Sequence, residues 1–535
     1  MPVSINPYKG AWTNTQVIHL LKRTMFGARI DDIAYFQKRT VTQAIDELLI
    51  PQKNVTLPLN NYSGVNAYVD TTGLKLGETW VNSKYGDGND NGRRLTSMKA
   101  WWVGQLIDQQ RSLEEKMTLF WSNHFSTQTS TVLDARFIYR TQNTIRTLSL
   151  GNFKAMAKAV TIDPGMLVYL NGRSSTLTAP DENYGRELQE LFTVGRGLNS
   201  KYTEDDVKAA AKVLTGFQVI QDPVGYTFNA NRHDKTDKTF SAFYGNKVIK
   251  GRTGADGEKE VDDLLDMIFA QNEVASFLCR ELYRFFFYYD ITAEVEQNFI
   301  TPLAKVFRDN NYEIKPVLKV MFLSEHFYDA TISGAIIKAP LDSVVGLCRE
   351  AGVVFPTVAD DLDSTYTFWR NIQQQAAVLQ QDIGDPPNVS GWQAYYQEPQ
   401  YHELWISTDT YPKRKTFTDL MVGTSSNVPS GFQKNGKKIS VDAISLVKKL
   451  KNPENPNLLI DQLLEVFYRV DIAKEIKDAW KKDIVLKGQS TDSYWTDAWN
   501  AHLAKPSDTM AKGIVESILR GLLFTIVTQP EYQLS

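Results

Sequence analysis

NYGRELQELF (residues 183–192) is the stretch from which both the fold class and the candidate site are predicted. At about 100° per residue, a helix places its polar side chains on one face, and these are Asn183, Arg186, Glu187 and Glu190. The apolar and aromatic side chains fill the opposite side, as in a helix packed on a core. The stretch predicts an amphipathic helix whose polar face is either a site or a solvated surface.

The same helical spacing of apolar residues recurs through most of the chain, for example after residues 112–115, over 203–214 and over 512–528. Two stretches differ. Residues 51–95 are rich in Pro, Asn, Gly and Ser, and residues 217–252 hold short β-prone runs between turn residues. We therefore predict a mainly α protein with a multi-helical body, a small β excursion and long loops.

The 535 residues exceed the size at which single hydrophobic cores usually stop growing, about 250–300 residues. We predict a main helical domain over 1–415, with 51–95 as an exposed loop and 217–252 as the β excursion. A polar linker (TSSNVPSGFQKNGKK, 424–438) opens the remainder, which is predicted to be a C-terminal helical subdomain over 416–535.

The charge balance argues against nucleic acid as a partner, because 59 Lys and Arg face 62 Asp and Glu. No run of 18 apolar residues predicts a membrane span. The first residues lack a secretory signal, so the chain as given is expected in the cytoplasm, with a periplasmic or exported location as the alternative if a signal has been removed. Cys279 and Cys348 lie in apolar helical contexts and are expected to be buried free thiols.

Two histidines are candidate site residues. His124, in FWSNHF, continues the apolar stripe of its helix and should point inward, where an imidazole needs a polar partner. It is either a hydrogen-bonded core residue or a neighbour of Glu187 and Glu190, and in the second case both glutamates should face protein rather than water. His233-Asp234 lies between β-prone runs and is either polar loop or part of a metal or proton-relay site.

A calcium site is suggested only weakly by Asp87-Gly88-Asn89-Asp90-Asn91-Gly92, which matches the first half of an EF-hand loop. The twelfth position, where a bidentate Glu is required, is Met98. The segment 87–92 is therefore predicted to be a flexible Asn/Gly turn rather than a calcium loop.

Two classes of function remain open. The first is an enzyme, with a catalytic set of Asn183, His124, Arg186, Glu187 and Glu190 between helices. In one form a divalent metal is bound by His124, Glu187, Glu190, His233 and Asp234, although the Glu-x-x-His spacing of helical di-iron sites is absent. In the other form carboxylates act as acid and base in hydrolysis of a glycan or ester, with Trp392 and Trp405 as stacking surfaces. The second class is a non-catalytic helical scaffold or binding protein that works with a partner.

Seven stretches, in this order, resemble the bacterial domain-of-unknown-function 1800 family. They are HLLKRTMFG (19–27), KMTLFWSNHFS (116–126), NYGRELQELFTVGRG (183–197), YTEDDVKAAAKVLTGF (202–217), RHDKTDK (232–238), DPPNVSGW (385–392) and TQPEY (528–532). The resemblance spans nearly the whole chain and implies a largely helical architecture with a shared site. It also implies a sulfatase-like, exported protein encoded nearby as a partner. Gly185 and Phe217 depart from the family pattern, in which Ala and Trp are expected.

Overall fold

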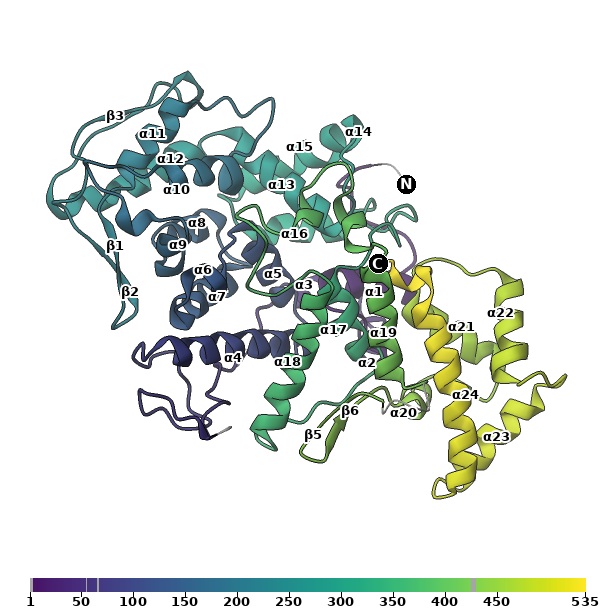
Figure 1. Ribbon diagram of the computed structural model, residues 1–535. Coiled ribbons are helices and arrows are strands. Elements are labelled where there is room, and N and C mark those ends of the chain that lie inside the picture. The colour runs from purple at the N-terminus through teal and green to yellow at the C-terminus, as the bar shows by residue number, and fades with distance from the viewer. Residues whose placement is uncertain (1–2, 54, 65–66, 425–429) are drawn as a thin grey trace.

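The computed structural model describes residues 3–53, 55–64, 67–424 and 430–535. Residues 54 and 65–66 of the predicted loop and residues 425–429 of the predicted linker lie outside the described residues. The described chain is mainly α, with three small two-stranded sheets, which confirms the predicted fold class (Figure 1).

The first part of the chain is helical except for the long loop between α3 and α4. Its elements are α1 (Asn14–Thr24), α2 (Ile30–Phe36), α3 (Val41–Leu48), α4 (Gly88–Ile107), α5 (Glu114–His124), α6 (Thr129–Val132), α7 (Ala135–Leu148), α8 (Phe153–Thr161), α9 (Pro164–Tyr169), α10 (Glu182–Glu187), the π-helical segment η3 (Leu188–Thr193) and α11 (Glu204–Val213).

The middle of the chain opens with two antiparallel hairpins and continues as helices. Its elements are β1 (Phe217–Ile220), β2 (Gly225–Phe228), β3 (Lys238–Thr239), β4 (Val248–Ile249), α12 (Glu260–Phe269), α13 (Asn272–Phe286), α14 (Ala293–Val295), α15 (Thr301–Asp309), α16 (Ile314–Leu323), α17 (Pro340–Glu350) and α18 (Leu362–Val378). β1 pairs with β2 and β3 with β4, with Phe217 opposite Phe228 and Lys238 opposite Ile249.

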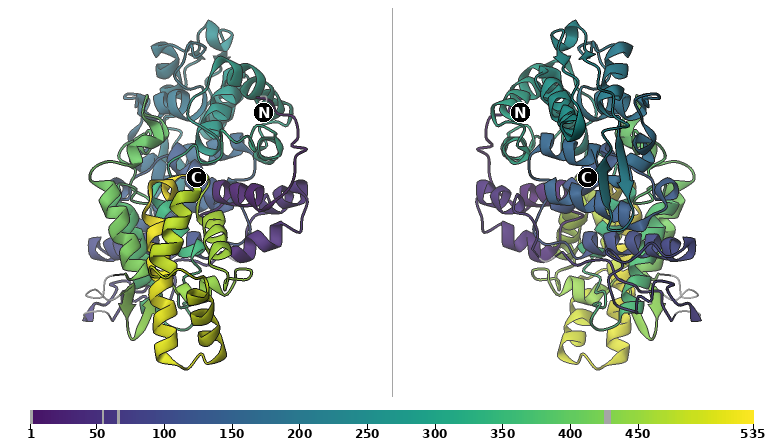
Figure 2. Two further views of the ribbon diagram at one scale, coloured as in Figure 1. Left: turned by 90° about the vertical axis from the view of Figure 1, so that its right-hand side faces the viewer. Right: turned by 90° about the vertical axis from the view of Figure 1, so that its left-hand side faces the viewer.

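The last part begins with a short 3-10 turn and includes the third hairpin. Its elements are η8 (Tyr401–Trp405), α19 (Thr410–Val422), β5 (Phe432–Lys434), β6 (Lys437–Ile439), α20 (Ala443–Val447), α21 (Pro456–Phe467), α22 (Lys474–Trp480), α23 (Ser493–Ala504) and α24 (Thr509–Thr528). The β excursion and the α23–α24 pair lie on opposite sides of the molecule in Figure 1, and α23 and α24 form its lower end in both views of Figure 2.

The C-terminal helices pack directly on the N-terminal ones. The hydrophobic core runs from Val17 in α1 to Tyr532 after α24. Lys22 of α1 donates to the carbonyl of Phe467 at the end of α21, over 3.3 Å. The division at residues 415 and 416 stays a prediction, because the core continues across it.

The segment at residues 87–92 is the start of α4, and the prediction of a flexible turn there is wrong. Asp87 is the N-cap and accepts from the backbone N–H groups of Asn89 and Asp90. Asp90 is fully buried and accepts from Tyr68 Oη at 2.5 Å and from Thr71. Short Asp side chains are strong N-caps, and here this preference outweighs the turn tendency of Asn and Gly. The same contacts anchor the preceding loop.

In the part of the chain that the structure describes, no helix combines the length and the apolar character that a membrane span requires. Cys279 and Cys348 are both buried free thiols, as predicted.

Candidate functional site

A cleft of about 270 Å³ opens where α5, η3 and α13 meet the loop that follows α18. Its walls combine aromatic rings with two basic and three acidic side chains and one histidine. The lining residues are Phe120, Asn123, His124, Glu190, Leu191, Arg196, Phe277, Glu281, Arg284, Phe285, Ser390, Tyr395, Tyr396, Glu398 and Tyr401. The cleft therefore brings together His124 and Glu190 of the predicted site.

His124 is packed among aromatic rings at the end of α5, including Phe125 at 4.8 Å and Phe153 at 5.9 Å between ring centroids. Its Nε2 lies 2.9 Å from the carbonyl oxygen of Phe192. A carbonyl only accepts, so Nε2 carries the proton and Nδ1 keeps its lone pair. Burial lowers the pKa of His124 to about 4, and the ring is neutral at physiological pH.

Glu190 faces protein, as the sequence predicted, with 8% of its surface exposed. It forms an ion pair with the largely exposed Arg196 at the mouth of the cleft, and Tyr202 Oη lies 3.5 Å from its other oxygen. Glu187 is half-buried and is not part of the cleft wall. Its Oε2 has no hydrogen-bond partner among the described residues, and burial raises the pKa of Glu187.

Arg186 does not pair with Glu190, although the two residues are four apart in the chain. Arg186 instead binds Glu204 at 2.7 Å and Glu182 at 3.4 Å. The π-helical turn η3 follows α10 directly and carries Glu190, and such turns occur often at functional sites. Neither Arg186 nor Asn183 lines the cleft with Glu190, and their predicted catalytic roles stay predictions. Asn183 is exposed to solvent.

Glu281 and Arg284, which the sequence analysis missed, supply the second wall of the cleft from α13. Arg284 Nη1 donates to Glu281 Oε1 at 2.8 Å, one helical turn away. Burial raises the pKa of the Glu281 carboxyl, although Arg284 opposes this. The signal was a Glu three residues before an Arg within the aromatic-rich run SFLCRELYRFFF (276–287), in which Arg280 is the other charged residue.

The loop DPPNVSGW packs against the histidine segment. Asn123 Oδ1 accepts from the backbone N–H of Trp392 at 2.9 Å, which fixes the loop over the end of α5. Trp392 and Trp405 are each only 4% exposed and are not part of this cleft wall. Both belong to the hydrophobic core and line a different hollow of about 250 Å³, beside Asp382 and Asp385, so their role as stacking surfaces stays a prediction. Phenylalanine and tyrosine rings line the cleft instead.

Gly391 is required for this contact. Its φ is +87°, and a Cβ at this position would lie 2.2 Å from Asn123 Oδ1. We expect Gly391→Ala to lower the free energy of unfolding by about 2–3 kcal/mol, from backbone strain and displacement of Asn123. The measurement is chemical denaturation.

Gly352→Ala is the matched control, because Gly352 has φ +66° but open space around it. Only the backbone cost of about 1 kcal/mol is expected there, and equal losses in the two variants would contradict the contact.

His233 and Asp234 belong to a separate buried network that holds the β excursion on α12. His233 Nδ1 donates to the carbonyl of Thr215 at 3.0 Å, and Nε2 lies 3.2 Å from Glu260. Lys238 Nζ binds the other oxygen of Glu260 at 2.6 Å. Burial alone would raise the pKa of Glu260, but His233 and Lys238 hold it below its usual value.

The predicted metal ligands are consequently not gathered in one place. Among the described residues, no three His, Cys, Asp or Glu side chains form a group that could hold a metal ion. His124 and Glu190 line the cleft, and Glu187 lies outside its wall. His233 and Asp234 belong to the separate network around Glu260. The donor set of the described residues does not fit a divalent metal.

The motifs that form the cleft and the β excursion are the ones on which the family resemblance rests. The family model described as "Protein of unknown function (DUF1800)" matches residues 19–534. No curated protein and no solved structure matches this chain. Since the match covers nearly the whole sequence, the chain belongs to the DUF1800 family.

Proposed function

We propose that this protein is a hydrolase that cleaves an ester or glycosidic bond in the His124 cleft by acid–base catalysis. One observation carries the proposal: a neutral imidazole and a carboxyl group of raised pKa line the same cleft. Two titratable groups whose pKa values are shifted in opposite directions by their environments are typical of a catalytic acid and base.

His124 is the proposed general base. Its Nε2–H is engaged by the carbonyl of Phe192, so Nδ1 is the nitrogen that can accept a proton from water. Among the described residues no hydrogen bond occupies Nδ1. The oxygen of the activated water would then form the new bond to the carbonyl or anomeric carbon of the substrate.

Glu281 is the proposed general acid. Its raised pKa favours the protonated form, which would donate to the leaving oxygen as the scissile bond breaks. The carboxylate left behind lies against Arg284, at 2.8 Å, which stabilises it until the proton from His124 is returned through solvent. Arg196 at the cleft mouth supplies positive charge for a developing oxyanion.

The experiment is a screen of the purified full chain against nitrophenyl esters and nitrophenyl glycosides. The double variant His124→Gln, Glu281→Gln is the comparison, and His502→Gln is the control, because His502 lies on α23 outside this cleft. We expect turnover that falls at least about 100-fold in the double variant and is retained in the control. Turnover that survives the double variant would refute the proposed residues.

If the wild-type chain turns over no substrate, the alternative function is that of a non-catalytic binding protein. The sulfatase-like exported partner implied by the family resemblance would then be the first ligand to test, by co-purification. The partner and the cellular location both stay predictions.

A further inference from the structure

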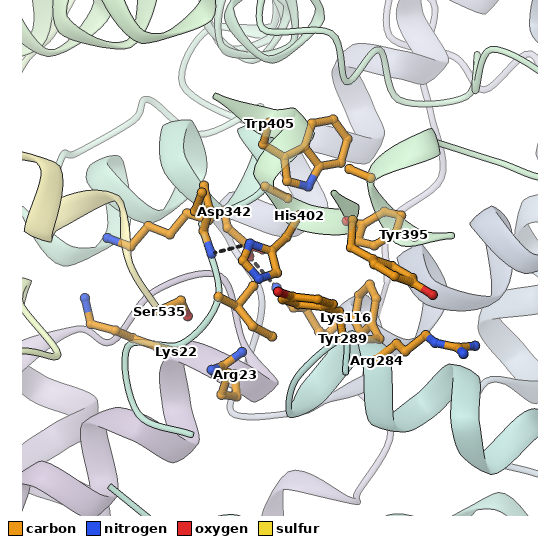
Figure 3. Close-up of a pocket in the computed structure, with 17 residues that line it drawn as sticks. Lys22, Arg23, Lys116, Arg284, Tyr289, Asp342, Tyr395, His402, Trp405 and Ser535 are labelled. Atoms are coloured by element: carbon orange, nitrogen blue, oxygen red, sulfur yellow. Dashed lines mark hydrogen bonds and ion pairs between the residues drawn. The ribbon is translucent and has the colours of Figure 1, made fainter. Parts of the chain in front are cut away.

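A second, smaller chamber lies directly behind the cleft and shares part of its wall, namely Arg284, Phe285, Tyr395 and Tyr401. Its volume is about 40 Å³. Figure 3 shows Arg23, Lys116, Tyr289 and His402 around it. These side chains come from α1, α5, the segment after α13, and η8. Four elements far apart in the sequence thus converge on one small space.

The wall of the chamber carries more positive than negative charge. Lys22, Arg23, Lys116, Arg284 and Lys338 line it, and Asp342 is the acidic side chain among its lining residues. Three of the cations have carboxylate partners: Lys22 pairs with Glu350, Lys116 with Asp342 and Arg284 with Glu281. Lys338 Nζ lies over the ring of Tyr532, 3.6 Å from its centroid. Ser535, also in the wall, forms no ion pair in the described part of the chain.

Arg23 and Lys338 are the two lining cations without a carboxylate at ion-pair distance in the described part of the chain, and Asp342 attracts Arg23 only at longer range. Arg23 is 4% exposed. One Nη donates to the carbonyl of Ile332 at 2.8 Å, while Nε is buried without an acceptor. A guanidinium remains charged in proteins, and burying an unpaired charge is costly. An anion in the chamber would remove this cost.

His402 adds a second donor without an acceptor. The backbone N–H of Ile337 donates to His402 Nδ1 at 3.3 Å, so in the neutral ring the proton is on Nε2. That nitrogen is buried and has no partner among the described residues. Tyr289 packs against the ring at 5.1 Å between centroids and brings a phenol hydroxyl to the same wall. The unengaged groups of the chamber are therefore hydrogen-bond donors.

The volume limits what can bind. A buried water needs about 10–15 Å³ of such space, so about 40 Å³ holds roughly three waters. This is the size of a carboxylate or a small inorganic oxyanion, and it is too small for a sugar ring. We propose that the chamber binds a small oxyanion through Arg23, His402 Nε2–H and the Tyr289 hydroxyl. The oxyanion is either free in solution or the anionic end of a molecule that reaches in from the cleft.

Calorimetric titration of the full chain with inorganic phosphate and with acetate tests the site. Titration with phenyl phosphate tests whether the anion can be part of a larger molecule that extends into the cleft. We expect one bound anion per chain and at least a tenfold weaker affinity in Arg23→Gln. Arg39→Gln is the control and should bind like the wild type, because Arg39 is a partly exposed arginine after α2 that does not line the chamber. If phenyl phosphate binds more tightly than inorganic phosphate, the natural anion is the charged end of a larger molecule in the cleft. If inorganic phosphate binds more tightly, the natural anion is a free ion.

Tyr289→Phe covers the case in which Arg23→Gln does not fold, because it removes one hydroxyl and no buried charge. A threefold or larger loss of phosphate affinity is expected there. No binding of any of the three anions by the wild type, or unchanged affinity in Tyr289→Phe and Arg23→Gln, would overturn the proposal. These measurements need no turnover, so their outcome is independent of the proposed hydrolase activity.

Discussion

Glu260→Ala is expected to lower the free energy of unfolding by about 3–5 kcal/mol, because it removes one partner of a buried ion pair. Glu260 and Lys238 are both fully or almost fully buried, and their contact is 2.6 Å. The ammonium of Lys238 would lose its carboxylate, and the backbone N–H of Arg252 would lose its acceptor at 2.6 Å. The β excursion should therefore detach from α12.

Chemical denaturation followed by far-ultraviolet circular dichroism measures this loss. Asp478→Ala is the matched control, since Asp478 forms an exposed pair with Lys474, one turn away on α22, and such pairs contribute little to stability. If Glu260→Ala lost no more than the control, the His233 network would not be structural, and the residues of RHDKTDK would have to be reconsidered as site residues.

His124→Gln is expected to lower kcat/KM for the substrate found in the screen by about 100- to 10,000-fold, the range typical of a lost general base. The amide nitrogen of glutamine can still donate to the carbonyl of Phe192, so the fold should persist while the proton acceptor is lost. Steady-state kinetics and a thermal melt of the same sample separate the two effects. A loss of activity that tracks a loss of folded protein would contradict a catalytic role.

The pH dependence follows from the two pKa shifts. The base must be neutral, and burial places the pKa of His124 at about 4, so activity should fall as pH drops through about 4. The acid must be protonated, and burial raises the pKa of Glu281, so activity should fall as pH rises through that raised value. The expected profile of kcat/KM is a bell whose optimum lies between the pKa of His124 and the raised pKa of Glu281.

The helical periodicity was sufficient to predict the fold class, because apolar spacing reports directly which face of a helix is buried. It also placed His124 inward, from its position on the stripe of Phe120 and Trp121. At 183–192 it did not indicate the π-helical turn of η3, because no local pattern in NYGRELQELF marks the change from α-helical to π-helical hydrogen bonding. The ion pairs of Arg186 with Glu182 and Glu204 were not predicted either.

The long-range contacts of the site were beyond local sequence patterns. Asn123 meets Trp392 across 269 residues, and Lys22 meets Glu350 across 328. Glu281 was missed because a single carboxylate in a mainly apolar helix is normally interpreted as a solvent-exposed residue. The cluster at 87–92 was misread because the N-cap preference of Asp87 is visible only once the helix that follows it is known.

The measurement that tests the central claim most directly is the pH profile of kcat/KM for the wild type and for Glu281→Gln, on the same substrate. Our interpretation predicts a bell for the wild type, with an acid limb near pH 4 set by His124. In Glu281→Gln the alkaline limb should disappear and the maximum should fall, because the titrating acid is gone. An alkaline limb that stays unchanged in Glu281→Gln, with a wild-type maximum, would contradict the assignment of the cleft as an acid–base site.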